Sequence, residues 1–232
     1  LEEYQTFEEF YDGYKALLDY YLDLSVKAQY HSYEVMNQHV SFLFTSLLTD
    51  DCIARGKALL DGGVRYLGGT NETYGNINTS DSLWVIRDLV FNQKKYTLRQ
   101  LNDAMLANFN GYEALRKDCL NCDKYGNDLE TADTMANDLY EFVAKGVRDR
   151  GIAIGMQYFL IVISNNQLNT EWGNRTAASP DGRLSCMYMN PANNPQGGAN
   201  KSGPTAMLNS LAKFDAKYHL SLIHISEPTR PE

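Results

Sequence analysis

Two groups of polar side chains are suited to hold a small organic ligand. Glu72, Tyr74 and Asn76 lie in a glycine-rich stretch, and Asn165 and Asn166 directly follow an apolar run. Ligands of α/β proteins bind beyond the carboxyl ends of strands, where such polar groups orient hydroxyl or carboxylate groups. The alternative is that these side chains only bridge loop backbone. Both interpretations stay open, and substrate binding by these five residues is our hypothesis.

The Cys-x-x-Cys pair and the histidines match no metal or redox motif. Cys119 and Cys122 lack the second Cys or His pair that a zinc site needs. A thioredoxin-like pair would follow a strand and open a helix, whereas this pair follows a predicted helix. His31 and His39 lack the spacing and glutamate of a zinc protease motif. We therefore expect ordinary loop thiols, packing or surface histidines, and no metal.

The remaining reactive side chains also have structural, non-catalytic interpretations. Cys52 lies in an apolar helical pattern, which is typical of a small buried side chain. Cys186 lies near Arg183, but no partner base is visible for a nucleophile. Arg183 could bind a carboxylate bidentately, although an Asp181–Arg175 contact or an Arg183–loop contact is the interpretation that we favour. No catalytic residue is assigned to this chain.

The stretch from Gly62 to Phe91 must position the first polar group. Its pattern predicts a β-like piece at 64–66, then a loop that contains Gly68, Gly69 and Gly75, and then a helix at 82–91. Asn78, Thr79 and Ser80 are candidate N-caps of that helix. A strand, a polar loop and a helix in this order form an α/β unit.

Helices dominate the rest of the chain. Thr6 with Glu9, and Thr97 with Gln100, are capping boxes that each open a helix. Apolar spacing and Pro204 at a first helical turn complete the pattern. Helices are predicted at 7–38, 42–60, 98–109, 112–120, 129–150 and 205–214.

One segment has the character of a buried strand. Residues 156–164 form a nearly continuous apolar, β-branched run, bounded by Gly155 and by Asn165. Such a run after a long helix indicates a strand of a parallel sheet, covered on both faces. The polar connection 165–203 that follows is long and structureless in its pattern, which is typical of a segment that lines a site or belongs to a larger assembly.

Composition excludes several classes of protein. The 232 residues suffice for one or two domains with a sizeable core. A net charge of −8 argues against a nucleic-acid partner, and no apolar run approaches the roughly 20 residues of a membrane span. Four cysteines are too sparse for a disulfide framework. We expect a cytoplasmic protein with neither nucleic-acid nor membrane partners.

Four strings in collinear order resemble one enzyme family. The first is Gly62–Phe91, with GGVRY, GGT-x-E-x-x-G-N, DSL and LVF; the others are KYGND (124–128), SPDGR (179–183) and GPTAMLNSLAK (203–213). Together they resemble the glycyl radical enzymes, the pyruvate formate-lyase-like family. The resemblance covers about residues 6–219.

The resemblance implies an α/β fold, as part of a ten-stranded barrel that is helix-rich with few buried strands here. It implies formate C-acetyltransferase-like or dehydratase-like lyase chemistry, in which a thiyl radical cleaves C–C or C–X bonds of a small metabolite in anaerobic bacteria. The radical resides on a backbone glycine and is installed by a radical-SAM activating enzyme, so no cofactor is bound. The full-length enzyme is expected to form a homodimer.

The family's radical motifs are missing from this sequence. Neither an R-V-x-G-Y string nor a cysteine in a G-C-x-E setting occurs. We therefore expect an internal piece from the later half of the barrel, inactive alone; the alternative is a non-catalytic, barrel-derived binding or partner protein. Residues 1–219 form the predicted partial domain. Residues 220–232 look like a translated sequencing adapter and are excluded from functional argument.

Overall fold

The computed structural model describes residues 4–156, 158–163 and 166–215, so the expected adapter segment lies outside the described residues. The described part is rich in helix with two strands. The elements are α1 (Phe7–His39), α2 (Leu43–Leu48), α3 (Cys52–Arg55), η1 (Leu59–Asp61), β1 (Gly68–Thr73), α4 (Asn76–Val85), η2 (Ile86–Asn92), α5 (Leu98–Leu106), α6 (Glu113–Asn121), α7 (Glu130–Ala153), β2 (Tyr158–Ile163), α8 (Asn166–Gly173) and α9 (Gly203–Ala212).

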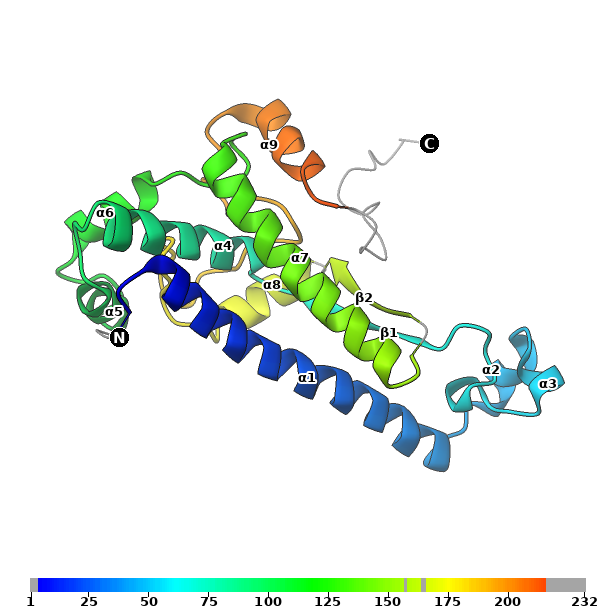
Figure 1. Ribbon diagram of the computed structural model, residues 1–232. Coiled ribbons are helices and arrows are strands. Elements are labelled where there is room, and N and C mark those ends of the chain that lie inside the picture. The colour runs from blue at the N-terminus through cyan, green and yellow to red at the C-terminus, as the bar shows by residue number, and fades with distance from the viewer. Residues whose placement is uncertain (1–3, 157, 164–165, 216–232) are drawn as a thin grey trace.

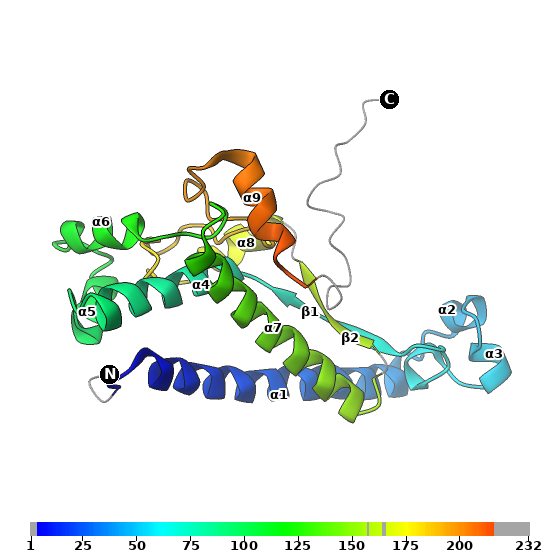
Figure 2. The ribbon, with the colours of Figure 1, turned by 45° about the horizontal axis from the view of Figure 1, so that its top comes forward.

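The two strands form a parallel pair flanked by the two longest helices. Gly68 lies opposite Tyr158, and Thr73 lies opposite Ile163. The connection between the strands runs through α4 to α7, and α7 then packs along β2 and α1 (Figures 1 and 2). This confirms the predicted strand in 156–164 and a parallel α/β arrangement. The ten-stranded barrel stays a prediction.

Local capping signals located several helices correctly. The Glu9 amide donates to Thr6 Oγ1 at 3.2 Å, and the Gln100 amide donates to Thr97 Oγ1 at 3.1 Å. Each box satisfies amides that the first helical turn leaves unpaired. The predicted long first helix, α5, α6, α7 and α9 are confirmed.

The predicted strand at 64–66 is wrong, because the strand lies at Gly68–Thr73. Arg65 Nε bonds Asp51 Oδ2 at 2.9 Å, which ties this piece to the turn before α3. The expected loop glycine Gly68 instead lies in β1, where its carbonyl accepts from the Tyr33 hydroxyl of α1 at 2.9 Å.

The predicted helix at 82–91 begins earlier and changes its geometry. α4 starts at Asn76, so the three candidate caps, Asn78, Thr79 and Ser80, lie inside it. From Ile86 the chain continues as a π-helix to Asn92. Gly75 precedes α4 in the left-handed conformation, which glycine adopts without the usual penalty.

Two further predictions need correction. The single helix at 42–60 is three short pieces, because Asp51 and Gly56 take left-handed conformations with φ of 73° and 62° that interrupt helical hydrogen bonding. The connection 165–203 is not structureless, since α8 lies inside it. Its amphipathic signal is short and surrounded by Asn and Gly.

The main core joins α1, α4, α5 and α7. Its buried side chains include Phe7, Leu83, Val85, Leu101 and Leu139. A second cluster, around Tyr125, Tyr140 and Phe214, packs the C-terminal end of α9 against α7. Burial of these large side chains is the main force that holds these helices together.

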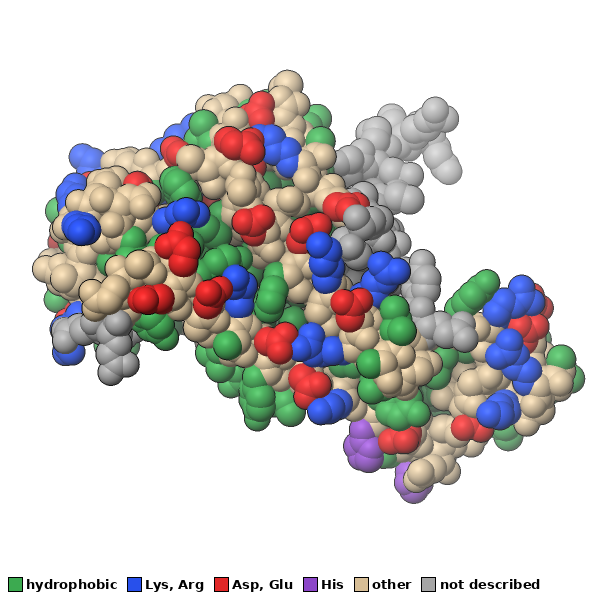
Figure 3. Space-filling view, viewed as in Figure 1, with side chains coloured by type: hydrophobic (Ala, Val, Ile, Leu, Met, Phe, Trp, Pro, Cys, Tyr) green, Lys and Arg blue, Asp and Glu red, His purple; other side chains and the backbone are tan. Residues whose placement is uncertain are grey.

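The segment 40–66 forms a lobe with an exposed apolar surface. It projects from one end of the molecule (Figure 1), and hydrophobic side chains reach its surface (Figure 3). At least three-fifths of each of the following side chains is exposed: Leu43, Phe44, Leu47, Leu48, Ile53 and Tyr66. Concentrated apolar exposure of this kind marks an interaction surface.

We expect the isolated chain to self-associate, because this lobe is exposed and the sheet has only two described strands with free edges. Size-exclusion chromatography with light scattering should give species above the 26.2 kDa monomer. Phe44→Lys should shift the distribution toward monomer, while Thr45→Lys, an exposed control on the same helix, should not. A monomeric peak with a cooperative thermal transition would contradict this expectation.

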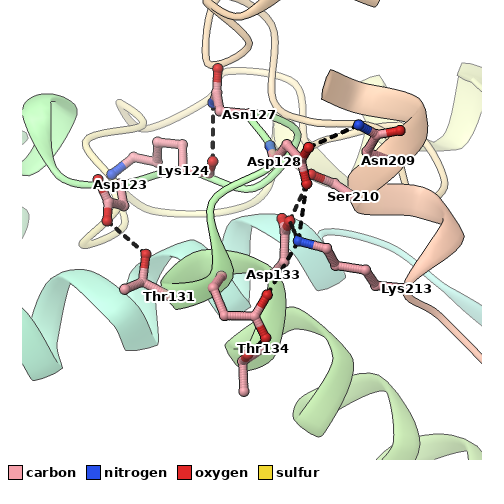
Figure 4. A network of polar contacts seen from close by, with 11 residues as sticks. Asp123, Lys124, Asn127, Asp128, Thr131, Asp133, Thr134, Asn209, Ser210 and Lys213 are labelled. Carbon is pink, nitrogen blue, oxygen red and sulfur yellow. Dashed lines mark hydrogen bonds and ion pairs between the residues drawn. The ribbon is translucent and has the colours of Figure 1, made fainter. Parts of the chain in front are cut away.

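α9 is held to the start of α7 by a polar network (Figure 4). Lys213 Nζ lies 2.8 Å from Asp133 Oδ2 and 3.1 Å from Asp128 Oδ1. The Ser210 hydroxyl also donates to Asp133 at 2.9 Å. The side chain of Asp133 is 0% exposed, so its carboxylate depends on these partners for the solvation that it has lost.

Lys213→Met should lower the free energy of unfolding by about 2 kcal/mol, because it leaves the buried Asp133 carboxylate without its cation. Urea unfolding followed by circular dichroism measures the change. The exposed control Lys27→Met should cost no more than about 0.5 kcal/mol. Adding Asp133→Asn to Lys213→Met should recover part of the loss; a double variant as unstable as the sum of both single changes would refute the pairing.

Candidate functional site

Glu72 and Tyr74 lie together at the carboxyl end of β1. Asn71 faces α1, since Ser25 Oγ donates to its Oδ1 at 3.1 Å. Side chains alternate along a strand, so Glu72 points to the opposite face, where it is exposed. The hydroxyl of Tyr74 donates to the Glu72 carboxylate. Burial, followed by this hydrogen bond, raises the pKa of Tyr74 above its ordinary value.

A cavity of about 410 Å³ borders the same strand end. Leu18, Leu22, Leu139 and Val143 give it apolar walls from α1 and α7. The stretch 71–76 forms its polar side. Trp172 of α8 and Met189 also line it. A mostly apolar cavity with a few polar groups at one side is typical of a small-molecule site.

The other predicted ligand-binding residues have different positions. The Asn76 side chain borders the cavity but bonds Asn190 and Asn193, which supports the structural interpretation for this residue. Asn165 lies outside the described residues. Asn166 is the first residue of α8, at the carboxyl end of β2. The two strand ends are therefore neighbours, as expected, while the substrate-binding role stays a prediction.

Asn190 organises the site, and sequence reasoning missed it. Its Oδ1 accepts from the amides of Ile77 and Asn78, both at 3.1 Å. Its Nδ2 donates to Asn76 Oδ1 at 3.1 Å and to Ala192 O at 2.7 Å. The side chain thus caps α4 from a loop 112 residues away from Asn78. The asparagine-rich run at 190–194 was the only signal in the sequence.

Arg183 makes the predicted loop contact. Its guanidinium donates to Met187 O at 2.9 Å and to Leu184 O at 3.3 Å. The Asp181–Arg175 contact is wrong, because Asp181 Oδ2 accepts from Asn78 Nδ2 at 2.6 Å whereas Arg175 pairs with Glu171. SPDGR is therefore a turn that ties its loop to α4.

The cysteines are placed mostly as expected. Cys119 is buried at the end of α6, and Cys122 caps that helix. Burial raises the pKa of Cys119 to about 12 and that of Cys122 to about 11, which disfavours the reactive thiolates. Cys52 is buried and Cys186 is exposed.

His31 and His39 lie exposed on α1, with His31 Nδ1 3.3 Å from Glu34. Among the described residues, His, Cys, Asp and Glu side chains form no group of three or more that could hold a metal ion. Within the same residues, no helix is both long enough and apolar enough to span a bilayer.

Comparison with known proteins identifies the family. The model of the family described as "Pyruvate formate lyase-like" matches residues 1–168. Trans-4-hydroxy-L-proline dehydratase of Clostridioides difficile is 31% identical over 213 residues, which cover 91% of this chain and 27% of the relative.

Solved structures show the same likeness. The crystal structure of hydroxyproline dehydratase from C. difficile with trans-4-hydroxy-L-proline bound superposes with a TM-score of 0.88, at 30% identity, over 94% of this chain and 28% of that one. The glycerol-bound B12-independent glycerol dehydratase from Clostridium butyricum gives 0.86, at 29% identity, over 92% of this chain and 27% of that one. The chain thus spans just over a quarter of the length of these relatives. It belongs to the glycyl radical enzymes of the pyruvate formate lyase-like family.

Proposed function

We propose that this chain forms part of the barrel wall of a glycyl radical dehydratase, and that Glu72 and Tyr74 contact its substrate. The observation that carries the proposal is the Glu72–Tyr74 pair on the open face of a parallel strand, at its carboxyl end. A carboxylate paired with a phenol can accept a proton from a substrate hydroxyl or bind that hydroxyl. The substrate is accordingly a small hydroxylated metabolite.

The similar proteins support dehydration over acyl transfer. The two described above are named for the removal of water from hydroxyproline and from glycerol. In this proposal, the glycyl radical lies in another part of the same enzyme, where a radical-SAM activating enzyme installs it. This radical is the source of the hydrogen abstraction from the substrate. The complete enzyme is a cytoplasmic homodimer of anaerobic bacteria. This chain contributes binding groups and barrel wall.

The test begins with the coding region on both sides of this sequence. The completed protein, activated without oxygen, should show a glycyl radical by electron paramagnetic resonance and should dehydrate a hydroxylated compound from a panel that includes trans-4-hydroxy-L-proline and glycerol. Glu72→Gln should lower kcat/KM at least about 10-fold with unchanged radical content. Glu34→Gln, an exposed change on α1, serves as the control.

Two outcomes would contradict the proposal. One is a Glu72→Gln enzyme that turns over its substrate as fast as the parent. The other is a completed reading frame that contains neither a radical glycine motif nor a cysteine in the family setting, which would favour the non-catalytic, barrel-derived protein.

A further inference from the structure

A second cavity, of about 240 Å³, shares no lining residue with the strand-end cavity. Its walls come from α4, α6, the loop before α7 and the segment 181–201. The charged residues that line it are Asp81, Arg116, Lys124, Asp181, Arg183 and Lys201. Four of them are at least nine-tenths buried, namely Asp81, Lys124, Asp181 and Arg183. Charges are rarely buried at this density without partners.

Two of the buried charges are fully engaged by the protein. Asp181 accepts from Asn78 Nδ2, from Ser179 Oγ and from the Arg183 amide. The Arg183 guanidinium donates to Ser179 Oγ and to backbone carbonyls, including that of Met187. Asp181 and Arg183 therefore have a structural role in the cavity wall, and few of their hydrogen-bonding groups remain free for a ligand.

The other two buried charges have unused capacity. Lys124 Nζ donates to Cys119 O at 2.6 Å, which uses one of its three donors; its side chain extends away from the Lys213 network (Figure 4). Asp81 Oδ1 accepts from the Tyr125 amide at 2.9 Å, but Asp81 Oδ2 is buried with no partner among the described residues. A buried carboxylate oxygen of this kind needs a hydrogen-bond partner, which an ordered water, an ion or a ligand group can supply.

Arg116 and Gln196 add one more donor and one more acceptor. Arg116 Nε donates to Gly182 O at 2.9 Å, which leaves the fork of its two terminal nitrogens for a planar anion. Gln196 Nε2 donates to Tyr188 O, while Gln196 Oε1 is buried with no partner in the described part of the chain. Apart from the exposed Lys201, the residues that line the cavity thus carry two cationic donors with unused capacity, on Lys124 and Arg116, and two buried oxygen acceptors without partners among the residues described, on Asp81 and Gln196.

We propose that this cavity binds a small α-amino acid. The carboxylate lies against Arg116 and Lys124, and the ammonium group lies against Asp81 and Gln196. A simple anion would leave the Asp81 carboxylate facing a like charge, and a simple amine would leave Lys124 and Arg116 without a counter-ion. A zwitterion satisfies both sides, and the volume accommodates a compact amino acid.

The proposal is tested by ligand binding to the completed protein without radical activation, so it does not depend on the proposed enzyme activity. Saturation-transfer NMR and calorimetry are run with glycine, L-alanine and L-proline as probes, and with acetate and ethylammonium as half-ligand controls. At least one amino acid should bind at least about 10-fold more tightly than either half-ligand, because each half-ligand lacks one charge-assisted contact.

Variants then assign the site. Asp81→Asn keeps the acceptor for the Tyr125 amide and should weaken binding at least about 10-fold. Arg116→Met, at a partly buried position in the cavity wall, should also weaken binding at least about 10-fold. This second variant tests the site even if the change at Asp81 disturbs folding. Lys117→Met, exposed on the same helix, is the charge-matched control.

Three results would overturn the proposal. They are amino acids that bind no better than acetate or ethylammonium, unchanged binding by both Asp81→Asn and Arg116→Met, and a ligand-soaked crystal structure with only water in the cavity.

Discussion

Replacing Asn190 with alanine should lower the free energy of unfolding by about 3–5 kcal/mol. The change removes the acceptor for the amides of Ile77 and Asn78, both of which are buried. Water cannot easily replace that acceptor, so each orphaned amide costs about 1–3 kcal/mol. Asn76 also loses its contact with Asn190 Nδ2.

Urea unfolding followed by circular dichroism gives the measurement, and a neighbour supplies the control. Asn194→Ala makes the same chemical change in the same loop, yet its side chain bonds neither amide of α4. It should cost less than about 1 kcal/mol. Equal losses for the two variants would mean that the loop, and not the cap, stabilises α4.

The elements that the sequence predicts correctly carry their signals locally. Thr6 with Glu9 and Thr97 with Gln100 place helix starts because both partners of each box lie within one turn. Residues 156–164 indicate a strand because they form a nearly continuous apolar run with β-branched side chains. In each case, the physical cause and the predicted feature share a few neighbouring residues.

The elements that it misplaces depend on distant partners. α4 starts at Asn76 because Asn190 caps it, and β1 lies at Gly68–Thr73 because Tyr33 and Ser25 of α1 bond its backbone and its Asn71. Neither contact leaves a periodic trace near the element that it fixes. Propensity is a weak prior, and tertiary contacts override it.

The candidate site divides in the same way. Glu72 in β1 and Tyr74 directly after it meet because they are only two positions apart. The sequence grouped them as candidate ligand-binding residues, although it placed both in a loop. The mixed-charge cavity could not be anticipated, because Asp81, Lys124 and Arg183 come from three strings that only folding brings together. Three of the four strings that carry the family resemblance therefore converge on one place in space.

The stability of the chain should fall between about pH 4 and pH 7 through Asp81. Loss of hydration on burial raises the pKa of Asp81 to about 7 from an ordinary 3.8, opposed by Lys124 and the Tyr125 amide and reinforced by Asp181 and Asp133. The folded state thus binds the Asp81 proton more tightly than the unfolded state does. Stability from the protonated form is complete below pH 4 and is lost as the pH rises through about 7, by about 4 kcal/mol in total.

Asp81→Asn removes the titration of Asp81 and leaves every other titrating group in place. The difference in stability between the variant and the wild type therefore reports Asp81 alone. Urea unfolding in amino-acid-free buffer should show that the free energy of unfolding of the variant, relative to that of the wild type, rises by about 4 kcal/mol between pH 4 and pH 8. The exposed control Asp103→Asn should track the wild type across the range. A constant difference between Asp81→Asn and wild type would mean that the Asp81 carboxylate is fully solvated or paired in the fold. In that case its Oδ2 is not the orphan that makes the cavity a binding site, so a flat pH profile would weaken the amino-acid proposal as well.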